Sequence, residues 1–313
     1  MSDIRVSTSA YQQSLIRQIA TNQSTVVDLS KQLASRRKVT LPEDDPIVMA
    51  RTMRRTTEKR ELLQFNTNNI LAENLIKSSE LKLSEMRALG DLAIAIGEST
   101  DAQASATERE SAWGRLNDLV NQALDLANAK SEDNYLFAGT DFAQDPYRID
   151  DNGTPADLSD DFVVYEGSPT DPSDPNFEEA EYYVGSNTKI APRLSPQYNE
   201  DIQNYIQHIL DLRNAFGGPT YDDVAVKAAI ADIETSDDRL VVATTDLALK
   251  QLRLETAKKA DTALFNQLDG SIAGEVGIDL AEVAVRLNQA QLGYEAALSS
   301  SSRILQVSLL DYI

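Results

Sequence analysis

The chain has 313 residues, of which 42% are hydrophobic and 6% aromatic, with one histidine, His208, and no cysteine. These counts exclude disulfides, cysteine-based chemistry and a metal site built from several histidines. The formal net charge of −21 argues against a nucleic-acid partner, because phosphates are contacted chiefly by Lys and Arg, and the lack of any run of about 18 apolar residues argues against a membrane span.

Residues 8–35 predict a helix with one narrow apolar stripe. Residues that recur every three or four positions form a seam along one side of a helix, and such a seam requires a partner helix. The members of this stripe are Leu15, Ile19, Asn22, Val26, Leu29 and Leu33.

A second helix is predicted from about residue 47 to about residue 97. Pro46 fits a first helical turn, and Asp44 or Asp45 can cap the free amides of that turn. We therefore interpret the two aspartates as caps rather than as a catalytic carboxylate pair, which would need to face one cleft from different environments. At 1.5 Å per residue the helix would be roughly 75 Å long, more than a compact globule needs. A third helix is predicted from Thr100 to Lys130.

The segment from residue 141 to residue 195 has a different character. It contains six of the ten prolines, and its runs Phe162–Tyr165 and Tyr182–Val184 favour strands. From Asp141 to Arg193 there are 13 acidic and 3 basic residues, a net charge of −10. The pattern predicts a small, acidic, β-rich insertion whose charge discourages aggregation, and it leaves open whether the insertion binds a ligand. Asp150–Gly153 is interpreted as a turn, because it lacks the alternating ligands of a calcium loop.

Helices are expected to resume near residue 199, to break at Gly217–Pro219 and to continue from about 221 to 268. After a break between Gly270 and Gly277, a last helix carries a second apolar stripe. Its members are Val276, Leu280, Val283, Leu287, Ala290, Tyr294, Ala297, Ser301 and Ile304.

The predicted fold class is mainly α, with long terminal and central helices in a coiled-coil or bundle rod and a small β-rich inserted domain. Outgoing helices can pair with returning ones on either side of the insertion. Three domains follow: a terminal coiled-coil domain (1–35 plus 277–313), a long-helix bundle domain (36–140 plus 196–276) and an acidic outer domain (141–195).

Three groups of motifs carry a family resemblance. They are Leu33–Ser35 followed by Pro42–Pro46, then Leu126–Asn128 with Tyr135–Thr140, and finally Asp279–Leu287 through Ser308–Ile313. With the helical layout, these motifs resemble the flagellin superfamily, and within it the hook-associated proteins of the hook-filament junction. One departure is visible: the family commonly has Ser-Gly where this chain has Ser35-Arg36. Glycine adopts a positive φ at little cost, whereas arginine does not.

The resemblance implies a non-enzymatic structural adaptor of the bacterial flagellum, exported without a cleaved signal and located outside the cell. It implies contacts with copies of the same chain in a ring, with the other junction protein, FlgK, with flagellin and with an export chaperone, and it implies no cofactor, nucleic acid or membrane. The alternative is a flagellin that forms the filament itself. A long-helix scaffold unrelated to flagella is a further alternative. An enzyme is disfavoured, because the sequence shows no Gly-rich phosphate loop and no nucleophile elbow.

Two sets of residues are predicted to make contacts between subunits. Arg51, Arg54 and Arg55 belong to a basic cluster between Arg36 and Arg60, with 8 basic and 4 acidic residues, and are expected to pair with carboxylates of neighbours, although a solvated helix face would explain them equally. The apolar set, which includes residues beyond the main stripes, is Leu15, Ile19, Val26, Leu29, Leu33, Leu280, Val283, Leu287, Tyr294, Ala297, Ile304, Leu305, Leu309 and Leu310.

Overall fold

The computed structural model describes residues 2–131, 133–140, 144–154, 158–174, 176–218 and 220–310, and it describes their side chains except for residues 2–9, 11, 12 and 303–310. The chain forms two compact units. The first consists of Met1–Glu61 with Leu264–Ile313, and the second of Leu62–Ala263.

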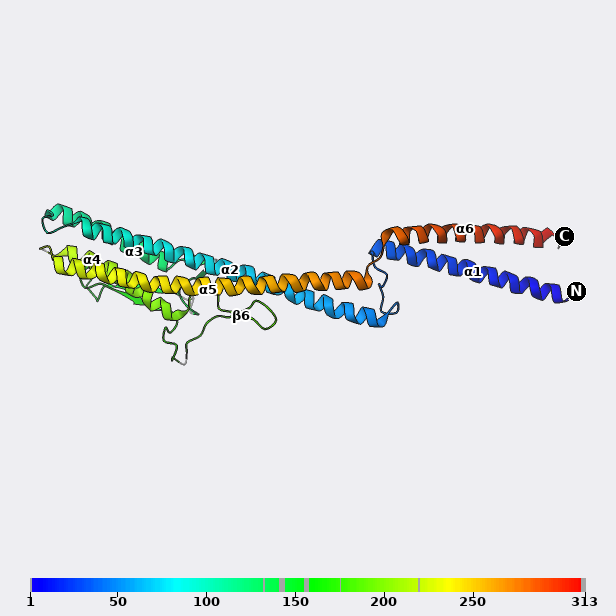
Figure 1. Cartoon of the computed structure of the whole chain (residues 1–313), viewed down its shortest axis with the longest axis horizontal. Helices are drawn as coiled ribbons and strands as arrows, with labels where there is room; N and C mark the ends of the chain where they lie inside the picture. The colour runs from blue at the N-terminus through cyan, green and yellow to red at the C-terminus, as the bar shows by residue number, and fades with distance from the viewer. Residues whose placement is uncertain are drawn as a thin grey trace. The chain divides into compact units, whose positions relative to one another are not determined.

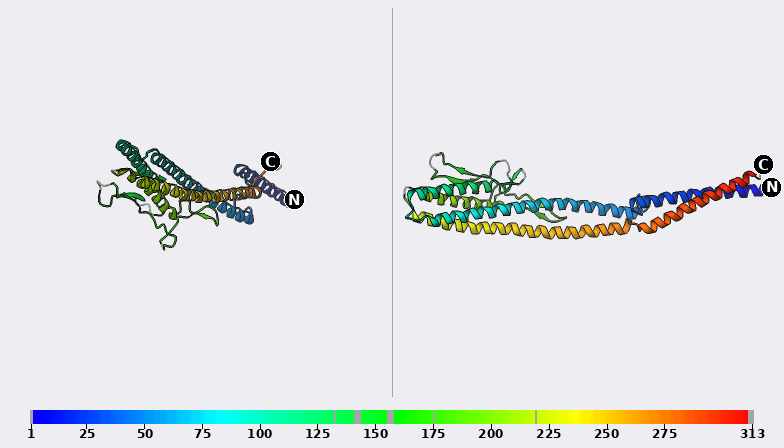
Figure 2. Two further views of the ribbon diagram at one scale, coloured as in Figure 1. Left: turned by 60° about the vertical axis from the view of Figure 1, so that its left-hand side comes forward. Right: turned by 90° about the horizontal axis from the view of Figure 1, so that it is seen from above.

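The first unit is built on a pair of terminal helices. Helices α1 (Ser2–Ser35) and α6 (Leu280–Leu310) pack against each other. They lie side by side and run in opposite directions, so that the start of α1 and the end of α6 are at the same end of the pair (Figure 1). The same arrangement is visible in the right-hand view of Figure 2. The unit also includes the first residues of α2 (Pro46–Ser99) and the last residues of α5 (Asp223–Val276).

The second unit is a four-helix bundle. It combines the rest of α2 and α5 with α3 (Ala106–Ala127) and α4 (Asn199–Gly217). Each helix contributes apolar residues at three- and four-residue spacing to one buried core, as expected for packed amphipathic helices. Fully buried members of this core include Ile76 and Leu83 on α2, Leu116 and Val120 on α3, Ile202 and Ile206 on α4, and Ile233, Leu240 and Leu247 on α5.

Helices α2, α3 and α6 begin where the sequence supplies a side-chain cap. Asp45 Oδ1 accepts hydrogen bonds from the amides of Ile47 and Val48, both at 3.0 Å, which confirms the predicted cap of α2. Ser105 and Glu108 form a reciprocal capping box at the start of α3. Asp279 Oδ1 accepts from the amides of Ala281 and Glu282 at the start of α6. These caps satisfy amides that have no partner inside the helix.

The described residues between α3 and α4 form three antiparallel strand pairs. β1 (Lys130–Ser131) pairs with β2 (Asn134–Tyr135), β3 (Tyr147–Asp150) with β4 (Phe162–Tyr165), and β5 (Tyr182–Tyr183) with β6 (Lys189–Ile190). A short 3₁₀ helix, η1 (Pro196–Tyr198), leads into α4.

Side-chain amides attach these strands to the bundle. Asn128 exchanges two hydrogen bonds with the backbone of Tyr147, at 2.8 and 2.9 Å. Gln207 accepts from the amide of Val163 at 2.8 Å, and Gln203 donates to the carbonyl of the same residue at 2.8 Å. Asn68 Nδ2 donates to the carbonyl of Tyr183 at 2.7 Å. The bundle thereby provides partners for backbone groups that such short strands leave unpaired.

The predicted mainly α fold class is confirmed. The strands predicted at Phe162–Tyr165 and from Tyr182 are also present, as β4 and β5. Several of the predicted helix and strand boundaries were wrong. The first helix begins at Ser2 rather than near residue 8, the third is shorter than predicted, and the described strands of the insertion have only two to four residues. The expected break at Gly270 is absent, because α5 continues to Val276. An isolated glycine costs a helix only about 1 kcal/mol relative to alanine, which packing can outweigh.

Helix α5 ends at Val276, and the residue that follows it is glycine for a steric reason. A Cβ atom at Gly277 would overlap the carbonyl oxygen of Ala273, so that only glycine fits.

The three-domain division stays a prediction. Within the described residues, no helix combines the length and the apolar character needed to span a membrane.

Candidate assembly surfaces

The predicted stripe of α1 is the half-buried side of that helix. All six of its residues are partly shielded from solvent, whereas nearly all other described residues from Gln13 to Ser35 are exposed. On α6, Val283 is buried and Leu287, Ala290, Tyr294, Ala297 and Ser301 are half-buried, but Leu280 is exposed. The two stripes therefore face each other within one chain. The role of these residues in contacts between subunits stays a prediction.

Apolar side chains also remain on the outer sides of this helix pair. Ile16 is 66% exposed and Val27 44%, and their separation of eleven residues places them on the same face of α1. Val285, Leu292 and Leu298 are similarly exposed on α6. These apolar side chains are positions that the described part of the chain leaves uncovered. The side chains of Ile304, Leu305, Leu309 and Leu310, and all of Tyr312 and Ile313, lie outside the described part.

The two connections that follow α1 and precede α6 are joined by backbone pairing. Arg37 and Gly277 form an isolated antiparallel bridge, and the amide of Lys38 donates to the carbonyl of Val276 at 2.8 Å. Arg36 adopts a φ of 56°, in the left-handed region. This is the residue that stands where the resembling family commonly has glycine, so the chain keeps a glycine-type backbone conformation with an arginine side chain.

The turn before α2 is organised by Asp44. Its Oδ2 atom accepts hydrogen bonds from the amides of Thr40 and Leu41, both at 2.9 Å. The bonds from the Leu41 and Thr40 amides hold the pKa of the Asp44 carboxyl below its usual value, because they stabilise the charged form. With Asp45 capping α2, both carboxylates have structural roles.

Three basic residues at the start of α2 form ion pairs with acidic residues of α5. Arg55 forms an ion pair with Glu275 at 2.8 Å, and Arg51 approaches the same carboxylate at 3.6 Å. Lys59, on the same side of α2, pairs with Asp269 at 2.5 Å and lies 4.4 Å from the ring centre of Phe265. These side chains connect α2 to α5 within the first unit.

Arg54 differs from its neighbours. It is exposed and makes no hydrogen bond or ion pair with any residue in the described part of the chain. Of the three arginines that the sequence singled out, the structure therefore leaves only Arg54 unpaired for a contact with another subunit.

Comparison with known proteins places these surfaces in a family context. Residues 6–141 match the family model described as the bacterial flagellin N-terminal helical region. None of the curated proteins matches the chain in sequence.

Solved structures extend the likeness to most of the chain. A flagellar hook-associated protein of Vibrio parahaemolyticus has a TM-score of 0.63 and 16% identity, over 75% of this chain and 100% of its own. FlgL of Bacillus cereus gives a TM-score of 0.56 and 14% identity over 70% of this chain and 99% of its own. The flagellar junction protein FlgL of Legionella pneumophila gives a TM-score of 0.54 and 14% identity, over 72% of this chain and 99% of its own. The chain thus has the fold of the hook-associated proteins.

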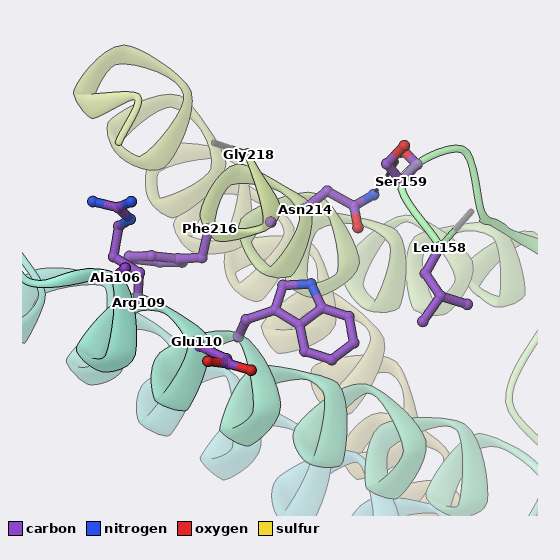
Figure 3. A pocket seen from close by; sticks show the side chains of 10 residues that line it. Ala106, Arg109, Glu110, Leu158, Ser159, Asn214, Phe216 and Gly218 are labelled. Carbon is purple, nitrogen blue, oxygen red and sulfur yellow. Dashed lines mark hydrogen bonds between the residues drawn. The ribbon is translucent and has the colours of Figure 1, made fainter. Parts of the chain in front are cut away.

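The second unit contains a pocket of about 520 Å³ between the start of α3 and the end of α4. Arg109 and Glu110 on α3 line it opposite Asn214 and Phe216 on α4, with a third side formed by the loop that carries Ser159 (Figure 3). Asn214 Nδ2 donates to the carbonyl of Ser159 at 3.2 Å, so this side chain holds the loop against the helix. No group of three His, Cys, Asp or Glu residues in the described ranges could hold a metal ion.

A buried polar cluster next to this pocket was missed by the sequence reasoning. The Arg213 side chain is 2% exposed and forms an ion pair at 3.2 Å with Asp161, which is 4% exposed. The guanidinium also donates to Asn117 Oδ1 at 3.0 Å and lies 5.6 Å from the ring centre of Trp113. A signal was present, because Arg213 continues the apolar spacing of Ile202, Ile206 and Ile209 on α4. The cluster fixes the insertion loop on α3 and α4, since a buried charge requires its partners.

Proposed function

We propose that the chain is a structural adaptor of the bacterial flagellum that joins the hook to the flagellin filament. One observation carries the proposal: in a chain with a hook-associated fold, the terminal helices α1 and α6 pair through one side and leave apolar residues exposed on their other sides. Burying such residues stabilises association by about 25 cal/mol per Å² of apolar surface. Copies of the chain are the natural partners for this surface, and they would form a ring.

The proposal includes several neighbours. The other junction protein, FlgK, would lie on the hook side and flagellin on the filament side, and an export chaperone would hold the apolar helix α6 before assembly. The chain would then act outside the cell, and it would do so without catalysis. The support is the fold shared with proteins described as FlgL and as a flagellar junction protein.

A deletion of residues 300–313 tests the role of the terminal pair. The bundle of the second unit should stay folded, because none of its residues is removed, while incorporation of the protein between hooks and filaments should be lost. Electron microscopy of hooks mixed with the purified protein and flagellin measures incorporation, and the fluorescence of Trp113 reports the fold of the bundle. Normal incorporation and normal motility after the deletion would refute the proposal.

A point variant gives a sharper version of the same test. Leu292→Asp places a charge on an exposed apolar position of α6 and should block incorporation without altering helix content. Gln291→Asp introduces the same charge at the adjacent exposed position and serves as the control. Equal incorporation of both variants would argue that the exposed apolar side of α6 makes no subunit contact.

The second candidate is a flagellin that polymerises with itself, and the flagellin-type N-terminal region favours it. A gene deletion separates the two functions. Loss of the junction protein should leave cells with hooks but release flagellin monomers into the medium. Loss of a flagellin should leave the junction proteins attached to the hook. Detection of this chain along the whole filament by immunolabelling would support the flagellin alternative.

A further inference from the structure

The second unit has a groove that is lined by residues of α2 and α3. The two helices run alongside each other (Figure 1). The groove has a volume of about 420 Å³. Its lining is Glu85, Ala88 and Leu89 from α2 and Gln122, Asp125 and Leu126 from α3. We refer to these six residues as the α2–α3 groove.

The groove continues into an exposed apolar stripe of α2. Leu81 and Leu92 are 55% and 53% exposed. Leu81, Ala88 and Leu92 lie on one side of the helix, with seven and four residues between successive positions, and the carboxylate of Glu85 interrupts this stripe. The apolar surface is therefore longer than the groove itself and extends for about three helical turns.

One carboxylate at the edge of the groove is unpaired. Asp125 is exposed and makes no hydrogen bond or ion pair within the part of the chain that the structure describes. Glu85, by contrast, is held by Lys82 at 2.7 Å. The groove thus combines an apolar floor with one free negative charge, which together suit a helix that carries an apolar side chain next to a cation.

The first residues of α2, in the first unit, present that combination. Ile47 is 71% exposed and Met53 54%. Ile47 and Arg54 share one side of the helix, since positions 47, 50 and 54 follow the spacing of one face, and the exposed Met53 borders this side, about 100° around the helix from Arg54. Because Arg51 and Arg55 are engaged by Glu275, Arg54 is the arginine of this group without a partner among the described residues. We call Ile47, Met53 and Arg54 the basic apolar face.

We propose that the α2–α3 groove of one subunit receives the basic apolar face of a second copy, with Met53 in the groove and Arg54 paired with Asp125. This inference rests on the proposed function, since it assumes that copies of the chain assemble. Two arguments support it. The charges are complementary, and both halves of the contact are on the same chain, so that one contact repeats from subunit to subunit as a heterologous interface.

Cysteine crosslinking tests the contact directly, because the chain has no cysteine of its own. Full-length Met53→Cys is mixed with full-length Ala88→Cys under assembly conditions, and disulfide-linked dimers are measured on a gel. A matched control mixes Met53→Cys with Leu249→Cys, since Leu249, like Ala88, is an exposed helix residue but lies on α5, outside the groove. We expect the first mixture to yield several times more mixed dimer than the second. Equal yields would overturn the proposed contact.

A third variant distinguishes this inference from the proposed function. Leu292→Cys reports association through the outer side of α6. Dimers through position 292 without dimers between positions 53 and 88 would overturn only the groove contact. The absence of dimers in every mixture would overturn the assembly of copies itself, and the groove contact with it.

A charge exchange tests the polar pair. Arg54→Glu and Asp125→Arg should each weaken self-association about fivefold, as expected when an exposed attraction becomes a repulsion. The double variant should regain most of the loss, because the pair is restored with reversed signs. Additive losses in the double variant would show that Arg54 and Asp125 are not partners.

Discussion

Replacing Arg36 with glycine tests whether the connection after α1 is strained. Arg36 has a φ of 56°, and a left-handed backbone costs a residue with a side chain about 1–2 kcal/mol. Glycine removes this cost but adds roughly 0.5–1 kcal/mol of conformational entropy to the unfolded chain. Arg36 is exposed, so the substitution creates no cavity. The net expectation is that Arg36→Gly stabilises the first unit by about 1 kcal/mol.

The expected effect is large enough to measure. The first unit has about 110 residues, so 1 kcal/mol corresponds to a rise of about 4 °C in its melting temperature. Hydrogen exchange followed by mass spectrometry reports this unit through peptides from 13–61 and 264–302. The only tryptophan, Trp113, lies in the second unit, so its fluorescence should show an unchanged transition there.

Two control variants separate the free-energy cost of the positive φ at Arg36 from the effect of losing the arginine side chain. Arg36→Ala removes the same charge but keeps a Cβ atom at positive φ, and should give no gain. Arg37→Gly removes the same side chain at a position without positive φ, and should destabilise by about 0.5–1 kcal/mol. If Arg36→Ala stabilised the unit as much as Arg36→Gly, the gain would come from the lost charge, and the reasoning from backbone strain would be refuted.

Three further predictions concern the second unit. Arg213→Met should destabilise it by about 3–5 kcal/mol, because the buried Asp161 loses its partner; urea unfolding followed by tryptophan fluorescence measures this, and a loss below 1 kcal/mol would contradict it. Burial raises the pKa of the Asp261 carboxyl, so its charge opposes folding above that pKa and protonation relieves the penalty as the pH falls. Asp261→Asn should therefore stabilise the unit at pH 7 and have little effect near pH 4; an equal effect at both pH values would argue against it. Gly90→Ala should destabilise the unit by about 2 kcal/mol, because the added Cβ atom would overlap the hydroxyl of Tyr205. Gly114→Ala should stabilise it by about 0.5–1 kcal/mol, because the added Cβ atom meets no atom within 4 Å and alanine favours the helix. Thermal unfolding measures both changes.

The sequence was most informative about the helices, because their signals are local. The spacing from Leu15 to Leu33 indicated which side of α1 would be half-buried, and Asp45 with Pro46 indicated where α2 would begin. It was least informative where local signals conflict with packing. Gly270 suggested a break, but α5 continues past it, and the insertion has more loop than the β-prone runs suggested.

The candidate surfaces show the same division. The sequence identified a basic cluster, but it could not separate Arg54 from Arg51 and Arg55, since the difference depends on Glu275, more than 200 residues away along the chain. Likewise, nothing local to Asp125 indicated that it would lie at the edge of a groove formed with α2.

The sequence by itself determined a mainly α chain with paired terminal helices, capped helix starts and a flagellin-like layout, because apolar spacing, prolines and aspartate caps act within a few residues. The tertiary structure alone decided which charged groups are paired, that Arg213 is buried against Asp161, and that Arg36 takes a left-handed backbone. These outcomes depend on contacts between residues far apart in the chain, whose energies exist only once the helices have packed.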